Sequence, residues 1–411
     1  MHSSIALLAF RVALAATLLT ACAGQSPVTS AGPPRPARGT SSAMTADDLR
    51  SRLYAFAHDS MMGREAGTRG NAMGTAYIAA EAARIGLDPA GDSGTWFQDI
   101  QSTSNRFASP IPPGTARNVI AVLRGSDPAL RNEYVAIGAH NDHVGVRSSP
   151  VDHDSLRAFN MALQRLGAPS WDRSVAPEKR AAAIIAARVN LDSLRRIRPQ
   201  RLDSIRNGAD DDGSGTVTVL EIAQALASAP VKPRRSILFV WHTAEEKGLL
   251  GAKWFTEHPT VPRASIVAQL NLDMVGRGSA ADITGGGPDY LQLVGSRRVS
   301  TQLGDIVEQV NGSRPRPFSF DYAYDANGHP ERIYCRSDHY MYARYGIPVT
   351  FFTTGLHADY HQVTDEPQYI DYEHMLRVAD LVRDVAVRVA NLDQRPVVDK
   401  PIGAPDAACV Q

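Results

Sequence analysis

Residues of the kind that bind catalytic metal ions recur along this 411-residue chain, each in a distinctive local context. They are His140 and Asp142 in GAHNDHVG, Asp211 in NGADDDGSG, the pair Glu245-Glu246 in HTAEEKGLLG, Asp273 in NLDMVGR, and His361 in DYHQVTDEP. With Asp142 and one carboxylate of the pair set aside, the rest offer His, Asp, Glu, Asp and His. This set suits two zinc ions that share one bridging carboxylate, and the spare carboxylate can act as a base. The predicted chemistry is hydrolysis by metal-activated water.

Cysteine is too scarce for a structural zinc site. The chain has three cysteines, Cys22, Cys335 and Cys409, so a Cys₄ site is impossible and the metal must be held by histidine and carboxylate. Cys335 and Cys409 could pair in an oxidising compartment. The Pro/Ala-rich surroundings of Cys409 argue against that pairing, but the sequence alone leaves it open.

Short apolar runs between turn residues predict the strands that position these side chains. The runs are 118–123, 134–138, 236–241, 266–272 and 348–353, and helical spacing is found over 45–87 and 216–228. Apolar strands alternating with helices indicate an α/β fold with a mostly parallel or mixed sheet covered on both faces. His140, Glu245 and Asp273 follow strands, and ligands gather beyond the carboxyl ends of such strands, so a single shared site is expected.

These motifs resemble those of the co-catalytic zinc exopeptidases of the aminopeptidase Y and bacterial leucyl aminopeptidase type. The resemblance runs from about Asp47 to Asp393 and includes the stretch GREAGTRGNAMGTAYIAAEAARIGLDPAGDSGTWFQ, which is similar to the family's opening helix and turn. It implies a three-layer α/β/α sandwich with a central mixed, mostly parallel sheet. We place this catalytic domain at 45–394.

The resemblance also implies how the metal residues are shared. Asp211 would bridge two Zn²⁺ ions, for which Co²⁺ or Mn²⁺ could substitute. His140 and Asp273 would complete one site, and Glu246 and His361 would complete the other. Family members have a cis peptide at the bond matching Asp211-Asp212, so a cis bond is expected here.

Three further residues are assigned catalytic roles. Glu245 is the predicted general base, which takes a proton from the water and passes it to the leaving amine. Asp142 resembles the carboxylate that orients the ligand imidazole of His140. Tyr334 matches a family tyrosine that donates a hydrogen bond to the developing oxyanion, although a buried aromatic beside the sheet is an equal alternative.

The remaining histidines are predicted to be structural. His143 is close to His140, but strand alternation would turn it to the opposite face. His357 stands four residues before His361 in a segment that resembles a loop, so His361 alone is favoured as a ligand. Lone histidines such as His339 and His374 are expected to pack in the core or lie on the surface.

The segment 147–206 matches nothing in the family's compact members. Two stretches of helical spacing, SLRAFNMALQRL and PEKRAAAIIAARVNLDSLRRI, are joined by the turn-like GAPSWDRSVA. Because both ends lie near metal residues, we expect a helical lid at the mouth of the site, with arginines that favour carboxylate groups. The alternative is a solvated decoration packed away from the cleft.

The N-terminal segment predicts export. Residues 1–21 form a short apolar signal segment, and Leu19-Thr20-Ala21-Cys22 resembles a bacterial lipoprotein cleavage box, with Cys22 as the lipidated residue; an ordinary signal peptide is the alternative. Residues 22–44 are predicted to be a flexible linker and 395–411 a C-terminal tail. The protein would then face the periplasm or cell surface on a lipid anchor.

The leading functional hypothesis is an aminopeptidase acting on peptides. A carboxypeptidase, for which Arg336 could bind the substrate carboxylate, or a glutaminyl cyclase on the same fold are the alternatives, and a non-catalytic binding module is a third class. A formal net charge of zero gives no support to nucleic-acid binding.

Overall fold

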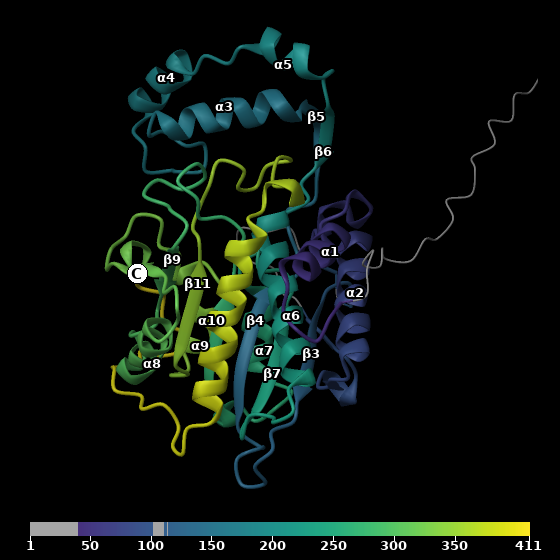
Figure 1. Ribbon diagram of the computed structural model, residues 1–411, viewed down its shortest axis with the longest axis vertical. Coiled ribbons are helices and arrows are strands. Elements are labelled where there is room, and N and C mark those ends of the chain that lie inside the picture. Colours follow the sequence, from purple (N-terminus) through teal and green to yellow (C-terminus); the bar gives the residue numbers. More distant parts are fainter. Residues whose placement is uncertain (1–39, 102–110, 113) are drawn as a thin grey trace, which may run out of the picture. The chain divides into compact units, whose positions relative to one another are not determined.

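The computed structural model describes residues 40–101, 111–112 and 114–411 (Figure 1). The predicted signal segment 1–21, the lipidation site Cys22 and most of the linker 22–44 lie outside the described residues and stay predictions. Within the described part of the chain, no helix is both long and apolar enough to cross a membrane.

Nine of the described strands form one mixed sheet in the order β1-β3-β7-β4-β8-β11-β9-β10, with β2 paired to β3. Strands β7, β4, β8 and β11 run parallel to one another at its centre. Strands β3 and β9 are antiparallel to this central group. The bounds are β1 Asp88–Pro89, β2 Phe97–Asp99, β3 Arg117–Leu123, β4 Tyr134–His140, β7 Ser236–His242, β8 Ile266–Leu272, β9 Tyr290–Val294, β10 Ser319–Asp321 and β11 Val349–Thr353. The predicted strands are therefore confirmed to within two residues.

Helices cover both faces of this sheet (Figure 1). Helices α1, α2, α6, α8 and α10 pack on one face and the shorter α7 and α9 on the other. Their bounds are α1 Ala46–Phe56, α2 Arg69–Ile85, α6 Gly215–Ser228, α7 Leu250–Glu257, α8 Thr301–Gly312, α9 His339–Ala343 and α10 Tyr372–Ala390. The three-layer α/β/α sandwich is confirmed.

The core follows from the alternation of side chains along the strands. In β7, Phe239 and Trp241 join the cluster under α6 and α10, while Leu238 and Val240 join the cluster with Phe255 of α7. All of these side chains are fully buried. Continuous apolar strands are typical of a sheet that is covered on both faces.

The N-terminal helical segment is broken, which the sequence did not predict. Helix α1 begins after Thr45, whose hydroxyl accepts from the backbone N–H of Asp48, and α2 ends at Gly86 with φ +86°. Between the two helices a 3-10 turn spans Asp59–Arg64. There Gly63 has φ +64°, and a Cβ would lie 2.5 Å from the carbonyl oxygen of Arg206. This close approach needs glycine and interrupts the helix.

Residues 147–206 form a separate helical unit on a two-stranded base. Strands β5 Val146–Asp152 and β6 Leu202–Ile205 pair antiparallel, and between them lie α3 His153–Arg165, α4 Pro177–Ala186 and α5 Leu191–Ile197 (Figure 1). The predicted second helix is thus split in two, and the ribbon β5–β6 was not predicted. Leu163, Ala168 and Ala183 form a small core between α3 and α4.

Candidate metal centre

The metal-type residues meet at the carboxyl edge of the central strands. β4 ends at His140, which pairs in register with His242 at the end of β7. Glu245 and Glu246 follow β7, and Asp273 follows β8. Since β4, β7 and β8 are adjacent and parallel, these side chains converge at one edge of the sheet.

Asp211 is held in a tight turn over Ala209–Ser214 that leads into α6. The peptide bond Asp211-Asp212 is cis, as the resemblance predicted. The Asp365 carboxylate accepts hydrogen bonds from the backbone N–H groups of Asp210 and Asp211. The flanking residues therefore stabilise the turn, and the Asp211 side chain is left to point into the site.

The two oxygens of Asp211 face different histidines. Oδ1 lies 3.2 Å from His140 Nε2, and Oδ2 lies 3.1 Å from His361 Nε2. Asp273 Oδ1 is 3.6 Å from the same His140 nitrogen, and Glu246 Oε2 is 3.0 Å from His361 Nε2. All five predicted ligands are thus brought together, with one carboxylate placed between two clusters.

Asp212 also lies near His140 and Asp273, at distances that a metal ion could span. Its oxygens, however, accept hydrogen bonds from three backbone N–H groups, those of His140, Gly215 and Met274. A carboxylate that is saturated by amides has little capacity left for a metal. We therefore assign Asp212 to holding the turn and Asp211 to the metal.

Unpartnered polar atoms show that a cation fits this site. Asp211 Oδ2, Glu246 Oε1 and His361 Nε2 are buried and make no hydrogen bond to other protein atoms. Leaving such groups without a partner is costly, and here the atoms converge on one point. Histidine and carboxylate together are the ligand types of catalytic zinc.

The local electrostatic environment shifts the pKa values of the adjacent carboxylates Glu245 and Glu246 in opposite directions. Burial raises the pKa of Glu245 well above its usual value, and Glu246 and Asp273 raise it further against the influence of His140. Burial also acts to raise the pKa of Glu246, but the imidazoles of His361 and His143 together outweigh it and lower that pKa to about 2. Two neighbouring carboxylates in such different environments are suited to different tasks.

Asp142 connects His140 to Glu245, although not as expected. Its Oδ1 accepts a hydrogen bond from the backbone N–H of Glu245 at 3.0 Å and lies 3.7 Å from His140 Nδ1. The group nearest to His140 Nδ1 is the backbone carbonyl of Asp142, at 3.1 Å. This carbonyl can fix the tautomer that leaves Nε2 free for a metal.

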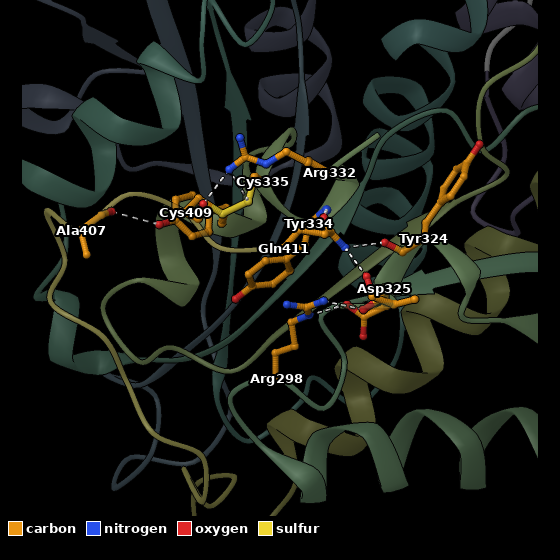
Figure 2. The surroundings of a disulfide bond; sticks show 11 residues. Arg298, Tyr324, Asp325, Arg332, Tyr334, Cys335, Ala407, Cys409 and Gln411 are labelled. Carbon is orange, nitrogen blue, oxygen red and sulfur yellow. Dashed lines mark hydrogen bonds and ion pairs between the residues drawn. A yellow bond between two sulfur atoms is a disulfide. The ribbon is translucent and has the colours of Figure 1, made fainter. Parts of the chain in front are cut away.

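Tyr334 does not face the site, and its predicted oxyanion role is corrected. Its buried ring packs under Arg298, with the guanidinium carbon 4.2 Å from the ring centre (Figure 2). The ring also contacts the rings of His339 and Tyr340. The 3-10 turn Ile333–Cys335 directs Ile333 into the cavity instead. The alternative of a buried aromatic describes Tyr334 correctly.

Tyr360, which the sequence did not single out, occupies the site. Its ring stacks on His361 with centroids 3.9 Å apart, and its hydroxyl accepts from Arg336 Nη2 at 3.1 Å. It lines the cavity next to Glu245 and Glu246. The sequence signal that could have pointed to Tyr360 was its position directly before the predicted ligand His361.

His143 is also misplaced by the sequence prediction. Its Nδ1 lies 2.9 Å from Glu246 Oε1, and the side chain is buried. The alternation argument fails because β4 ends at His140, three residues earlier. His357, by contrast, pairs with Asp210 at 3.1 Å, outside the ligand clusters. His339 packs on Phe351, in agreement with its predicted structural role.

The family model described as "Peptidase family M28" matches residues 118–386, which include every ligand named above. The chain belongs to peptidase family M28. Leucine aminopeptidase 1 of Aspergillus fumigatus is 31% identical to this protein over 195 residues, which are 44% of this chain. The matched region is 47% of that protein, so the M28 chain spans about half the length of the curated relatives it matches.

Solved structures share the fold of the M28 chain. A leucine aminopeptidase precursor from Bacteroides thetaiotaomicron superposes with a TM-score of 0.55 at 16% identity, over 84% of this chain and 97% of that one. A glutaminyl cyclase from Porphyromonas gingivalis has a TM-score of 0.54 at 18% identity, over 83% and 97% of the two chains. At these identities the likeness is one of fold.

A cavity opens directly beside the candidate metal ligands Asp211, Glu246 and Asp273. Its wall is largely apolar, and Glu245 and Asp273 lie at its metal end. The apolar part is formed by Met274, Ile333, Phe351 and Leu356, with Tyr324 and Tyr360 beside them. The cavity therefore places an apolar surface next to the candidate ligands.

A wider cleft continues outward from the ligands and is walled by segments distant in the sequence. Trp171 and Arg173, from the turn between α3 and α4, line it together with Glu246 and His361. The helical insertion therefore reaches the mouth of the site, as expected for a lid. Arg332 and Arg336 line the same cleft.

Cys335 and Cys409 form a disulfide, a pairing that the sequence left open and that the surroundings of Cys409 argued against (Figure 2). The predicted tail 395–411 folds back onto the body, where the Gln411 side chain accepts from the backbone N–H of Tyr334 and donates to the carbonyl of Tyr324. Arg332 donates to the carbonyl of Cys409. Composition around Cys409 could not reveal these contacts.

Proposed function

We propose that this protein is an aminopeptidase that uses two zinc ions to release an apolar N-terminal residue from peptides. The observation that carries the proposal is the apolar cavity directly beside the metal ligands. Met274, Ile333, Phe351 and Leu356 offer a first side chain no charged partner. Transfer of such a side chain from water into this cavity would contribute about 1.5–3 kcal/mol to binding.

The residues would divide the work as follows. Bound zinc would supply a Lewis acid that polarises the scissile carbonyl and lowers the pKa of water. Asp211 lies between the two clusters and would set their spacing. Glu245, whose Oε2 is 3.8 Å from His140 Nε2, would accept a proton from the attacking water and deliver it to the leaving amine.

Arg336 and Tyr360 also line the cavity beside Glu245 and can offer hydrogen-bond donors to the substrate. The Tyr360 hydroxyl accepts from Arg336, so its own hydrogen is free to be donated into the cavity. That geometry supports Tyr360, rather than Tyr334, as the donor to the developing oxyanion.

The same contacts weaken the carboxypeptidase alternative. Arg336 lies 2.8 Å from Glu331 and also binds Tyr360, so part of its hydrogen-bonding capacity is used within the protein. The glutaminyl cyclase alternative is weakened by the complete set of five ligands, since those enzymes use a single zinc ion. The curated relatives that carry the name leucine aminopeptidase favour the aminopeptidase.

One pair of peptides tests the proposal. The zinc-loaded protein would be incubated with a Leu-initiated peptide and with its N-acetylated copy, and products would be identified by mass spectrometry. We expect release of leucine from the free peptide alone. Equal cleavage of both from the C-terminus would establish a carboxypeptidase, and cyclisation of an N-terminal glutamine without hydrolysis would establish a cyclase.

A further inference from the structure

His143 is an unexplained buried imidazole at the metal centre. Neither ring nitrogen makes a hydrogen bond to another protein atom, and the side chain is almost fully buried. Its Nδ1 lies 2.9 Å from Glu246 Oε1 and 3.7 Å from Asp211 Oδ2. Both of these oxygens are themselves buried without a hydrogen-bond partner. This nitrogen and these two oxygens lie close enough to one another to be ligands of one cation.

The ring is fixed in this position by its packing. Gly208 has φ +56°, and a Cβ there would lie 2.5 Å from His143 Cγ, so the ring rests directly on the backbone of this glycine. On another side it meets the ring of His361 edge-on, with centroids 5.5 Å apart. The approach of Nδ1 to the carboxylates is therefore built into the fold.

We infer that His143 Nδ1 is an additional ligand of the ion held by Asp211, Glu246 and His361. The two halves of the centre are then unequal, because this half has two imidazoles whereas the half with His140 and Asp273 has one. A site with more imidazole ligands favours zinc and cobalt over manganese. The inference rests on metal binding by this family and does not depend on which peptides are cleaved.

The competing explanation is that His143 only donates a hydrogen bond to Glu246 and so positions that ligand. His143→Gln separates the two, because an amide N–H can still reach Glu246 but supplies no imidazole nitrogen. His143→Phe removes both capacities and keeps a ring against Gly208. His339→Phe is the matched control, since His339 is an equally buried histidine that stacks on Phe351 and contacts none of the ligands.

Zinc affinity and cobalt spectra of these variants test the inference. We expect His143→Gln and His143→Phe each to weaken one of the two zinc equivalents by about 10–100-fold or more in competition with a chelator. Their Co²⁺ visible spectrum should shift and intensify as one ion loses a ligand. The control should keep both equivalents and the wild-type spectrum. Unchanged affinity and spectrum in His143→Gln would overturn the inference in favour of the hydrogen bond.

A measurement on the unaltered protein guards against variants that fail to fold. Zinc X-ray absorption of the fully loaded protein counts the imidazoles bound to metal. We expect three for two zinc ions, from His140, His143 and His361. A count of two would overturn the assignment. Because no substrate is involved, this outcome is independent of the peptide test of the proposed function.

Discussion

At the scale of single residues, two adjacent carboxylates at this centre lie in different environments. Glu246 faces His361 and the unpartnered atoms of the metal cluster, while Glu245 lines the cavity with its carboxylate beyond bonding distance of His140. This difference supports our proposal that Glu246 is a metal ligand and Glu245 the base.

Glu245→Gln should separate metal binding from turnover. The variant keeps every ligand, so we expect both zinc ions to be retained while kcat falls about 10²–10⁴-fold through loss of the base. Zinc content would be measured by mass spectrometry and kcat with a Leu-initiated substrate. Loss of metal in this variant would mean that the roles of Glu245 and Glu246 are reversed.

Asp211→Ala is the contrasting change. Because each oxygen of Asp211 faces a different histidine, its loss should weaken both metal positions at once. We expect far less than two zinc ions per chain after dialysis. Retention of one tightly bound ion would show that Asp211 does not bridge.

His339 makes the fold sensitive to acid. Burial lowers the pKa of His339 to about 3, so the folded state resists protonation that the unfolded chain accepts near pH 6.5. The contribution of His339 to stability is therefore complete above pH 6.5 and is lost as pH falls towards 3, by on the order of 3 kcal/mol at pH 4. His339→Phe should reduce this loss in urea unfolding measured between pH 7 and 4. An identical pH dependence in both proteins would contradict it.

At the scale of elements, the helical insertion and the sheet have different duties. The candidate ligand His140 ends a strand of the sheet, and the candidate ligands Glu246 and Asp273 follow strands of the sheet. The outer cleft, by contrast, is walled in part by the turn that carries Trp171 and Arg173. Arg157 of α3 also pairs with Asp359, close to the ligand His361. The insertion is therefore held against the ligand loop rather than projecting freely.

Removal of the helices should widen the range of peptide lengths. Replacing residues 153–201 by an Asn-Gly turn keeps the β5–β6 ribbon, because Asp152 and Leu202 are paired. We expect kcat/KM for peptides of about twenty residues to rise relative to that for dipeptides, since the outer wall is gone. An unchanged ratio, with the melting temperature and zinc content preserved, would favour a decoration without influence on access.

These elements also show where sequence inference holds and where it stops. Strands such as SILFVW were predicted because a short, continuous apolar run between turns is compatible with few structures other than a buried strand. The β5 sequence VRSSPVD is polar and carries no such signal. His143 and Tyr334 were misassigned because one residue's difference in where a strand or turn ends reverses a side chain's direction. The five predicted ligands do converge in the structure, because each lies in its own motif and the chemistry of metal binding restricts the choice of residue types.

At the scale of the whole molecule, our proposal that the protein lies in the cell envelope depends on the sequence before residue 40. If Cys22 is lipidated, Cys22→Ser should abolish incorporation of labelled fatty acid and move the protein from the membrane to the soluble fraction. Unchanged membrane association without label would indicate an ordinary signal peptide and another mode of attachment.

The β5–β6 ribbon has one more consequence. Its two strands hold both ends of the insertion 147–206 in adjacent, hydrogen-bonded positions. These ends lie between His140 and Asp211, where a short loop could connect the chain instead. Natural variation there can lengthen, shorten or replace the insertion while the catalytic side chains keep their positions. The ribbon is thus a position at which the segment that determines selectivity can be exchanged while the catalytic residues stay unchanged.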